Sequence, residues 1–123
     1  MERVTGIGGV FFRANDPLEL AHWYRDRLGV DSGVDGESVW RQEPGPTVFA
    51  PVDSDASYYF AGPEQAVMVN FRVRDLDAMV AQLRAGGADI DGEIETEEGT
   101  GRFAWVIDPE GNRVQLWEPH LEE

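Results

Sequence analysis

The chemistry that this sequence offers comes mainly from aromatic rings and side-chain amides. Asn70 and Gln115 each carry a hydrogen-bond donor and an acceptor, and Trp105 and Trp117 supply large flat rings in the segment around Gln115. Amides orient a ligand through directional hydrogen bonds, while indole faces stack on planar groups or hold cations. Residues of these types in strand-like segments are typical of a pocket for a small organic molecule.

Metal and covalent chemistry have few candidates in this chain. Cysteine is absent, which excludes disulfides, thiolate ligands and thiol nucleophiles. His22 lies in a helical pattern and His120 lies near the end of the sequence, so we expect both imidazoles at the surface. The acidic run 95–98 borders a Gly-Thr-Gly sequence, a composition that is typical of a solvated loop rather than a cation site.

Composition narrows the range of partners. The 123 residues carry a formal net charge of −14 and no basic run, which excludes nucleic acid because phosphates require clustered Lys and Arg. The acidic surface either favours a cationic ligand or serves solubility. No apolar run approaches the roughly 20 residues that cross a bilayer, and the first residues lack a secretion signal. We therefore expect one cytoplasmic domain over residues 1–123, without a membrane partner.

One strand-then-helix pattern occurs twice in the sequence. Each copy begins with an apolar segment rich in strand formers and then reaches an aspartate, Asp16 or Asp75, that is placed to cap a helix. The two helices are expected to close at Gly29 and Gly86. The repetition predicts two similar modules that share one core.

Strand-forming composition marks further segments in both halves. The expected strands cover residues 4–13, 38–42, 47–50, 58–60, 90–96, 103–107 and 113–117. Residues 108–112 (DPEGN) predict a hairpin turn between the last two strands. The Gly-Pro pair in residues 61–64 is the expected seam between module one, about residues 1–62, and module two, about residues 63–123.

Three segments together carry a family resemblance. Residues 23–29 (WYRDRLG), 71–77 (FRVRDLD) and 108–119 (DPEGNRVQLWEP) resemble the vicinal oxygen chelate superfamily, which contains glyoxalases, bleomycin-resistance proteins and extradiol dioxygenases. The resemblance implies an α+β fold in which two βαβββ modules form one curved, barrel-like mixed sheet with helices outside. It also implies a ligand cleft inside the sheet, often completed in a homodimer.

The resemblance identifies the positions at which members of the superfamily hold a metal ion. Those positions fall on Gly9, Met68 and Gln115 in this chain, and the remaining one falls within residues 57–60, where only a serine or tyrosine hydroxyl is available. Glycine has no donor atom, and a thioether is a poor ligand for the hard divalent ions that the superfamily uses. We therefore expect no metal and no other cofactor.

Strand parity then assigns the side chains that face the cleft, because successive residues of a strand point to opposite faces. The predicted ligand-binding set is Gly9, Phe11, Trp40, Phe49, Met68, Asn70, Trp105, Gln115 and Trp117. Arg72 and Arg113 share this parity, and we expect their charged heads at the rim, paired with Asp or Glu. The alternative is that the aromatic residues form a packed core, although a glycine in the middle of a strand leaves space there.

Three functions are consistent with these observations. The first is a metal-free protein that binds and sequesters a planar or cationic small molecule in an aromatic cleft, which a homodimer interface would complete. The second is a divergent lyase, isomerase or dioxygenase of the same superfamily, for which no general base is evident. The third is a non-catalytic interaction module.

Overall fold

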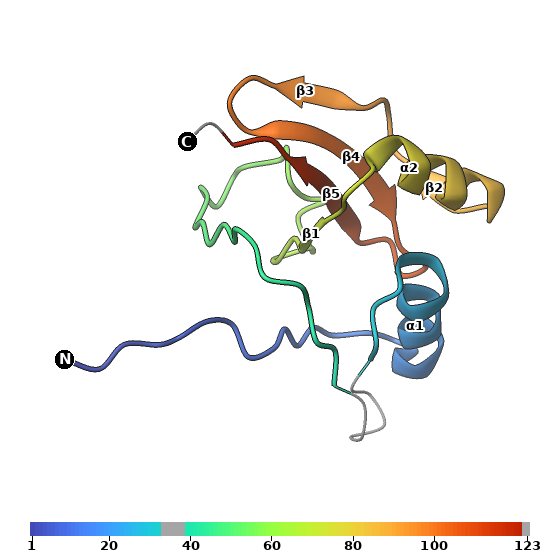
Figure 1. Ribbon diagram of the computed structural model, residues 1–123. Coiled ribbons are helices and arrows are strands. Elements are labelled where there is room, and N and C mark those ends of the chain that lie inside the picture. Colours follow the sequence, from blue (N-terminus) through green and yellow to red (C-terminus); the bar gives the residue numbers. More distant parts are fainter. Residues whose placement is uncertain (33–38, 122–123) are drawn as a thin grey trace.

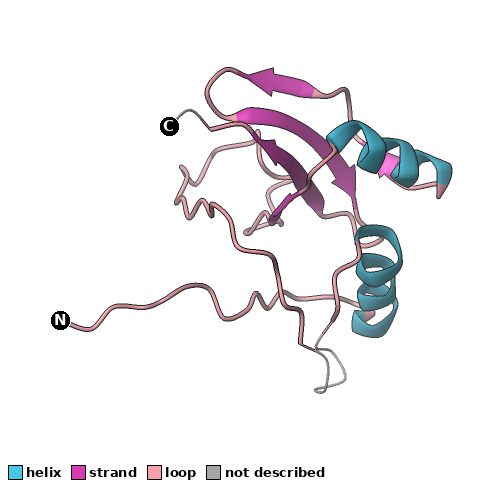
Figure 2. Cartoon of the chain, in the orientation of Figure 1, coloured by secondary structure: helices cyan, strands magenta, loops and turns pink. Residues whose placement is uncertain are grey.

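The computed structural model describes residues 1–32 and 39–121 (Figure 1). In chain order its elements are α1 (Pro17–Trp23), the π-helical segment η1 (Tyr24–Leu28), β1 (Asn70–Arg72), α2 (Leu76–Ala85), β2 (Asp89–Ile90), β3 (Glu95–Glu97), β4 (Gly101–Ile107) and β5 (Arg113–Pro119). Within the described residues, every strand therefore lies in the second half of the chain (Figure 2).

Both helices begin at the aspartates that the sequence predicts as caps. The Asp16 carboxylate accepts a hydrogen bond from the Glu19 N–H at 3.1 Å, and the Asp75 carboxylate accepts one from the Ala78 N–H at 3.0 Å. These bonds satisfy N–H groups that the first turn of a helix leaves without partners. Gly29 follows η1 with φ of 73°, a left-handed conformation that glycine adopts without strain.

The sheet is mixed, and its strand order is β1-β5-β4-β2. β1 runs parallel to β5, while β4 pairs with β5, β2 and β3 in antiparallel fashion. The long β4–β5 pairing runs from Gly101 opposite Pro119 to Ile107 opposite Arg113, which confirms the hairpin predicted at the end of the sequence.

Asp108 holds the turn of this hairpin and connects it to the first helix. Its carboxylate accepts hydrogen bonds from the backbone N–H groups of Glu110 and Asn112 at 2.9 and 3.0 Å. The Tyr24 hydroxyl donates to the same carboxylate at 2.8 Å, in a buried contact. The turn that joins β4 to β5 therefore also fixes η1 against the sheet.

One face of the sheet carries the hydrophobic core. The side chains of Ala104, Val106, Val114 and Leu116 alternate along β4 and β5 and pack with residues of α2, α1 and η1. The members contributed by the helical segments are Leu20, Tyr24, Leu76, Val80 and Leu83. We call this surface the core face.

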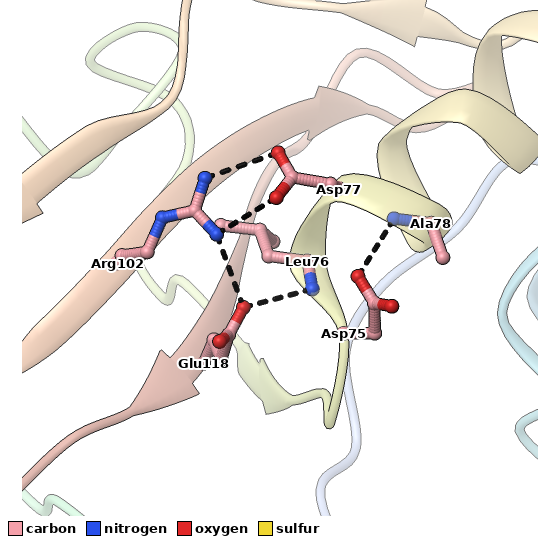
Figure 3. A network of polar contacts seen from close by, with 6 residues as sticks. All are labelled: Asp75, Leu76, Asp77, Ala78, Arg102 and Glu118. Atoms are coloured by element: carbon pink, nitrogen blue, oxygen red, sulfur yellow. Dashed lines mark hydrogen bonds and ion pairs between the residues drawn. The ribbon is translucent and has the colours of Figure 1, made fainter.

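A charged network ties the start of α2 to the outer end of the hairpin (Figure 3). Arg102 of β4 donates two hydrogen bonds of 3.0 Å to the carboxylate of Asp77. The hydrogen bonds from Arg102 lower the pKa of Asp77. Glu118 of β5 accepts from the Leu76 N–H at 3.0 Å and lies 3.4 Å from the same guanidinium. Two strands and one helix are thereby joined at a single point.

The α+β class and the mixed sheet are confirmed, but the sheet is open. The strands expected over residues 4–13, 47–50 and 58–60 are absent, and residues 39–42 form none either; position 38 lies outside the described residues. A strand forms only where its backbone groups bond to a neighbouring strand, and these segments lie beside no partner strand (Figure 1). The strand expected over residues 90–96 divides into β2 and β3 around Gly92, whose φ is 82°.

No helix in the described part of the chain combines the length and the apolar composition that crossing a membrane requires.

Candidate functional site

The face of the sheet opposite the core face carries aromatic, amide and arginine side chains. Two cross-strand rows define it, because paired residues of neighbouring strands point to the same side. Asn70, Gln115 and Trp105 form one row, and Arg72, Trp117 and Phe103 form the next. With Arg113, which continues the alternation along β5, we call this set the aromatic face.

The first row combines two amides with a buried indole. Asn70 Nδ2 donates to Gln115 Oε1 at 2.7 Å, and Gln115 is only 6 % exposed. Trp105 is 1 % exposed, and its Nε1 is the one buried side-chain nitrogen or oxygen in the described residues that has no hydrogen-bond partner. A buried donor without an acceptor is costly, so this N–H marks a position that an acceptor would stabilise.

The second row places a cation beside stacked rings. The rings of Phe103 and Trp117 are 6.2 Å apart between centroids and nearly parallel, at 4°. Trp117 Nε1 donates to the Thr100 carbonyl at 3.0 Å, so this indole, unlike that of Trp105, is satisfied. Within the described residues, Arg72 donates to two uncharged oxygens, Gln42 Oε1 at 3.3 Å and the Glu43 carbonyl at 3.0 Å, and forms no ion pair. The expected pairing of Arg72 with an acidic residue is therefore wrong for this part of the chain.

Arg113 already occupies one face of the Trp105 ring. Its guanidinium carbon lies 3.7 Å from the ring centroid, and its Nε donates to Asp91 at 3.0 Å. A second nitrogen of the same group donates to the Tyr58 carbonyl. The expected pairing of Arg113 with an acidic residue is confirmed, and this cation takes the position that a cationic ligand would otherwise take on Trp105.

Tyr58 also packs against the ring of Trp105 and helps to bury it. The two rings meet edge to face at 90°, with centroids 5.4 Å apart. The Tyr58 hydroxyl donates to Glu95 Oε1 at 3.1 Å, and burial together with this hydrogen bond raises the pKa of Tyr58. Tyr58 itself is exposed, so it is a thin cover held by its ring contacts and by polar contacts with Glu95 and Arg113.

The long connection before β1 carries this cover and crosses the side of the sheet that faces away from α2 (Figure 1). Gln65 anchors its end to β5, because its side-chain amide bonds both the N–H and the carbonyl of Arg113 at 2.9 Å. The turn at residues 42–45 anchors its beginning through Arg72. A Cβ at Gly45 would overlap the Arg72 guanidinium, so glycine lets the turn and this side chain approach closely without a shift of the arginine.

The structure brings together about half of the ligand-binding set expected from sequence. Asn70, Trp105, Gln115 and Trp117 share the aromatic face, and Met68 is half-buried two residues before Asn70. Trp40 instead contacts Phe71, at 5.9 Å between centroids, and Phe71 packs against the core.

The remaining members of the set lie away from this face. Phe11 is 97 % exposed and Phe49 is 85 % exposed. A Cβ at Gly9 would meet only the ring of Phe11, so the space expected beside this glycine opens to solvent and not to a pocket.

Sequence reasoning missed the residues that cover and brace the aromatic face. Tyr58 belongs to a segment that was expected to be a strand, and the roles of Glu95, Asp91 and Gln65 depend on contacts over more than 20 residues of sequence. The only available signal was the Tyr58-Tyr59-Phe60 cluster, which is unusually aromatic for a connection.

A separate cavity of about 350 Å³ lies at the start of α1, between Asp16, Glu19 and Pro109. The backbone N–H groups of Asn15 and Asp16 are already bound by the Glu110 carboxylate, at 2.6 and 2.7 Å. The N–H groups that would bind an anion in this cavity are therefore occupied. The contact between Glu110 and these N–H groups instead connects the start of α1 to the hairpin turn.

The sequence matches the family described as a glyoxalase-like domain over residues 9–117. The chain belongs to this family. No curated protein matches it.

Solved structures share the fold of this glyoxalase-like protein at low sequence identity. TnmS3, an antibiotic binding protein from Streptomyces sp. CB03234, is 22 % identical with a TM-score of 0.63 over 98 % of this chain and 100 % of its own. A glyoxalase/bleomycin resistance protein/dioxygenase superfamily member from Sphaerobacter thermophilus is 18 % identical with a TM-score of 0.58, over 94 % and 98 % of the two chains. A glyoxalase/bleomycin resistance protein from Streptomyces sp. CB03234 is 24 % identical with a TM-score of 0.50, over 85 % and 92 %.

The residues at the superfamily's metal positions do not fit a metal ion in this glyoxalase-like chain. Gly9 has no side chain and is exposed, and Met68 offers only a thioether. Gln115 Oε1, the remaining donor, accepts the hydrogen bond from Asn70. Among the described residues, no three side chains of His, Cys, Asp or Glu are grouped closely enough to hold an ion.

Proposed function

We propose that this glyoxalase-like protein binds and sequesters a planar organic molecule on its aromatic face without using a metal. The observation that carries the proposal is the unpartnered Nε1 of Trp105 within a row of two amides and beside stacked rings. An unsatisfied buried donor costs about 1–3 kcal/mol. A ligand oxygen that accepts this hydrogen bond recovers that free energy, and the rings of the aromatic face supply stacking.

Entry of the ligand requires displacement of Tyr58. Its edge-to-face contact with Trp105 and its polar contacts with Glu95 and Arg113 are exchanged for contacts with the ligand. Moving Tyr58 uncovers part of the Trp105 ring, and a planar ligand that stacks there covers this apolar surface again. The description of TnmS3 as an antibiotic binding protein supports a binding role for a chain of this fold.

We also propose that residues 1–123 act as one domain of two modules that is completed in a homodimer. The first half presents large apolar side chains to solvent, and the strand-forming segments that contain them have no partner. These residues include Val4, Phe11, Val39, Val48 and Phe49. Apolar surface of this extent marks an interaction site on a soluble domain, and a second copy provides equivalent segments to pair with.

The proposed function predicts which ligands stabilise the protein against heat. Planar polycyclic antibiotics are expected to raise Tm in a saturable way, whereas aliphatic compounds of similar mass are not. EDTA is expected to leave these shifts unchanged. The measurement is a thermal-shift screen in paired buffers with and without the chelator.

A matched pair of variants locates the site for any compound that binds in this screen. Gln115→Leu removes the central amide of the aromatic face and is expected to weaken binding by about tenfold, measured calorimetrically. Gln82→Leu makes the same chemical change on the outside of α2 and is expected to change the affinity by less than about twofold. Equal effects of the two variants would place the ligand elsewhere, and loss of binding in EDTA would refute the metal-free proposal.

A further inference from the structure

We propose that the ligand is an aromatic anion, a planar molecule bearing a carboxylate or phenolate that Arg72 binds. This inference rests on the proposed function and specifies the chemical class of the molecule. It reverses the cationic preference that the acidic composition suggests, and it follows from the distribution of charge and hydrogen-bond donors on the aromatic face.

Arg72 is the arginine of this region that lacks an acidic partner among the described residues. Arg113 pairs with Asp91, and Arg102 pairs with Asp77 and Glu118. Arg74, two positions along from Arg72, pairs with Glu43. The partners of Arg72 are an amide oxygen and a backbone carbonyl, so its positive charge is solvated by dipoles and is not neutralised.

The guanidinium of Arg72 retains unused hydrogen-bonding capacity. Both of its hydrogen bonds leave from one nitrogen, Nη2, whereas a guanidinium carries five N–H donors. The remaining donors of Arg72 are suited to a carboxylate or phenolate oxygen. Arg72 is half-buried, and a charge-assisted hydrogen bond is stronger in such a position than in open solvent.

The indole N–H of Trp105 is the second unpaired donor on the aromatic face, and it lies close enough to Arg72 for one planar molecule to reach both. Trp105 is two strands and two residues away from Arg72 in the register of the sheet, which corresponds to about 12 Å between Cα atoms. The stacked rings of Phe103 and Trp117 lie between them. A fused-ring aromatic molecule with oxygens toward its ends therefore reaches both donors while it covers the rings.

The acidic groups nearby do not occupy the anion position. Glu95 lies at the far end of the row that begins with Arg72, three strands away, which corresponds to about 14 Å between Cα atoms. The Glu95 carboxylate accepts a hydrogen bond from the Tyr58 hydroxyl. Asp91 is paired with Arg113. The net charge of −14 acts over the whole surface, but such charges are largely screened beyond about 8 Å at physiological ionic strength.

Three probes that differ only in charge test the inference: anthracene-2-carboxylate, anthracene-2-carboxamide and 2-(aminomethyl)anthracene. We expect the carboxylate to bind about tenfold more tightly than the carboxamide and the ammonium to bind most weakly, as measured by fluorescence titration. In two-dimensional NMR spectra of the indole N–H groups, the Trp105 signal is expected to shift on binding, whereas the Trp117 signal, already bonded to Thr100, is expected to move less.

Matched arginine variants assign the charge preference to one residue. Arg72→Gln is expected to lower the affinity for the carboxylate to that for the carboxamide and to leave the carboxamide affinity unchanged. Arg74→Gln, which removes a neighbouring exposed arginine held by the same turn, is expected to change neither affinity. Circular dichroism and the indole spectra confirm that both variants are folded.

The possible outcomes separate this inference from the function on which it rests. If the ammonium binds as tightly as the carboxylate, or if Arg72→Gln has no more effect than Arg74→Gln, the anion inference is wrong while the binding role stands. If none of the three probes binds, the inference is overturned, and the proposed function fails as well once the antibiotics also leave Tm unchanged.

Discussion

In the part of the chain that the structure describes, Trp105 Nε1 is the only buried side-chain nitrogen or oxygen without a hydrogen-bond partner. Tyr24 is also buried in the core, and its hydroxyl donates to Asp108. Burial is the main cause that raises the pKa of Tyr24 above its usual value, and the hydrogen bond and negative charge of Asp108 add to it. The Trp105 N–H, by contrast, is buried without a partner, and this difference supports a ligand site at Trp105.

Tyr24 predicts a distinct dependence of stability on alkaline pH. Lysine and cysteine are absent, so tyrosine is the one side-chain type in this sequence whose ordinary pKa lies near 10. The unfolded chain releases the Tyr24 proton near pH 10 while the folded chain keeps it. The contribution of Tyr24 to the free energy of unfolding is therefore constant well below pH 10 and decreases above it. At pH 11 this contribution is smaller by about 1.4 kcal/mol.

The variant Tyr24→Phe isolates this contribution. It loses the hydrogen bond to Asp108 and is expected to be about 1–3 kcal/mol less stable at pH 8. The difference from the parent is expected to narrow by about 1 kcal/mol between pH 10 and pH 11. Urea unfolding at pH 8, 10 and 11 measures both quantities, and parallel declines of the two proteins would contradict the assignment.

At the element scale, local signals predicted both helices and the final hairpin. Asp75 caps α2 through a bond within one turn, and the Asp108 turn closes through bonds within four residues. Interactions this short in sequence are readable without a structure. The charged network at the start of α2, by contrast, joins Arg102, Asp77 and Glu118, which lie up to 41 positions apart (Figure 3). No local sequence pattern predicts these contacts.

The capping role of Asp75 predicts a difference between two substitutions. Asp75→Ala removes the acceptor for the Ala78 N–H and is expected to lower the free energy of unfolding by about 1 kcal/mol. Asp75→Asn keeps an acceptor oxygen and is expected to cost less than half as much. Chemical denaturation of the two variants provides the measurement. An equal loss in both would show that charge, and not the cap, is what stabilises α2.

At the scale of the whole molecule, the sequence predicted the class of fold better than the arrangement of its first half. The repeat and the family motifs led to the α+β class, whereas the core face was not predicted residue by residue; its side chains alternate along β4 and β5 with those of the predicted ligand-binding set. The same parity placed Asn70, Gln115, Trp105 and Trp117 on one surface. It failed for Phe11 and Phe49, because parity has meaning only within a paired strand.

The exposed apolar side chains of the first half predict that the protein forms a homodimer in solution. The double variant Phe11→Asp/Phe49→Asp places charges in the most exposed apolar segments and is expected to be monomeric, whereas the parent sediments as a dimer. Leu18→Asp, which charges an exposed apolar position on α1, is the control and is expected to remain dimeric. Analytical ultracentrifugation distinguishes the cases, and a parent protein that is monomeric at high micromolar concentration would exclude the proposed dimer.

The order in which the elements occur also has a consequence during synthesis on the ribosome. Every strand in the described part of the chain follows residue 69, and both α1 and η1 are fastened to the hairpin turn by Glu110 and Asp108. More than half of the polypeptide therefore emerges before anything exists for it to fold against. The side chains of Leu20 and Tyr24, which the folded protein buries, therefore stay uncovered until the hairpin has been synthesised, an interval in which the growing chain is prone to aggregate.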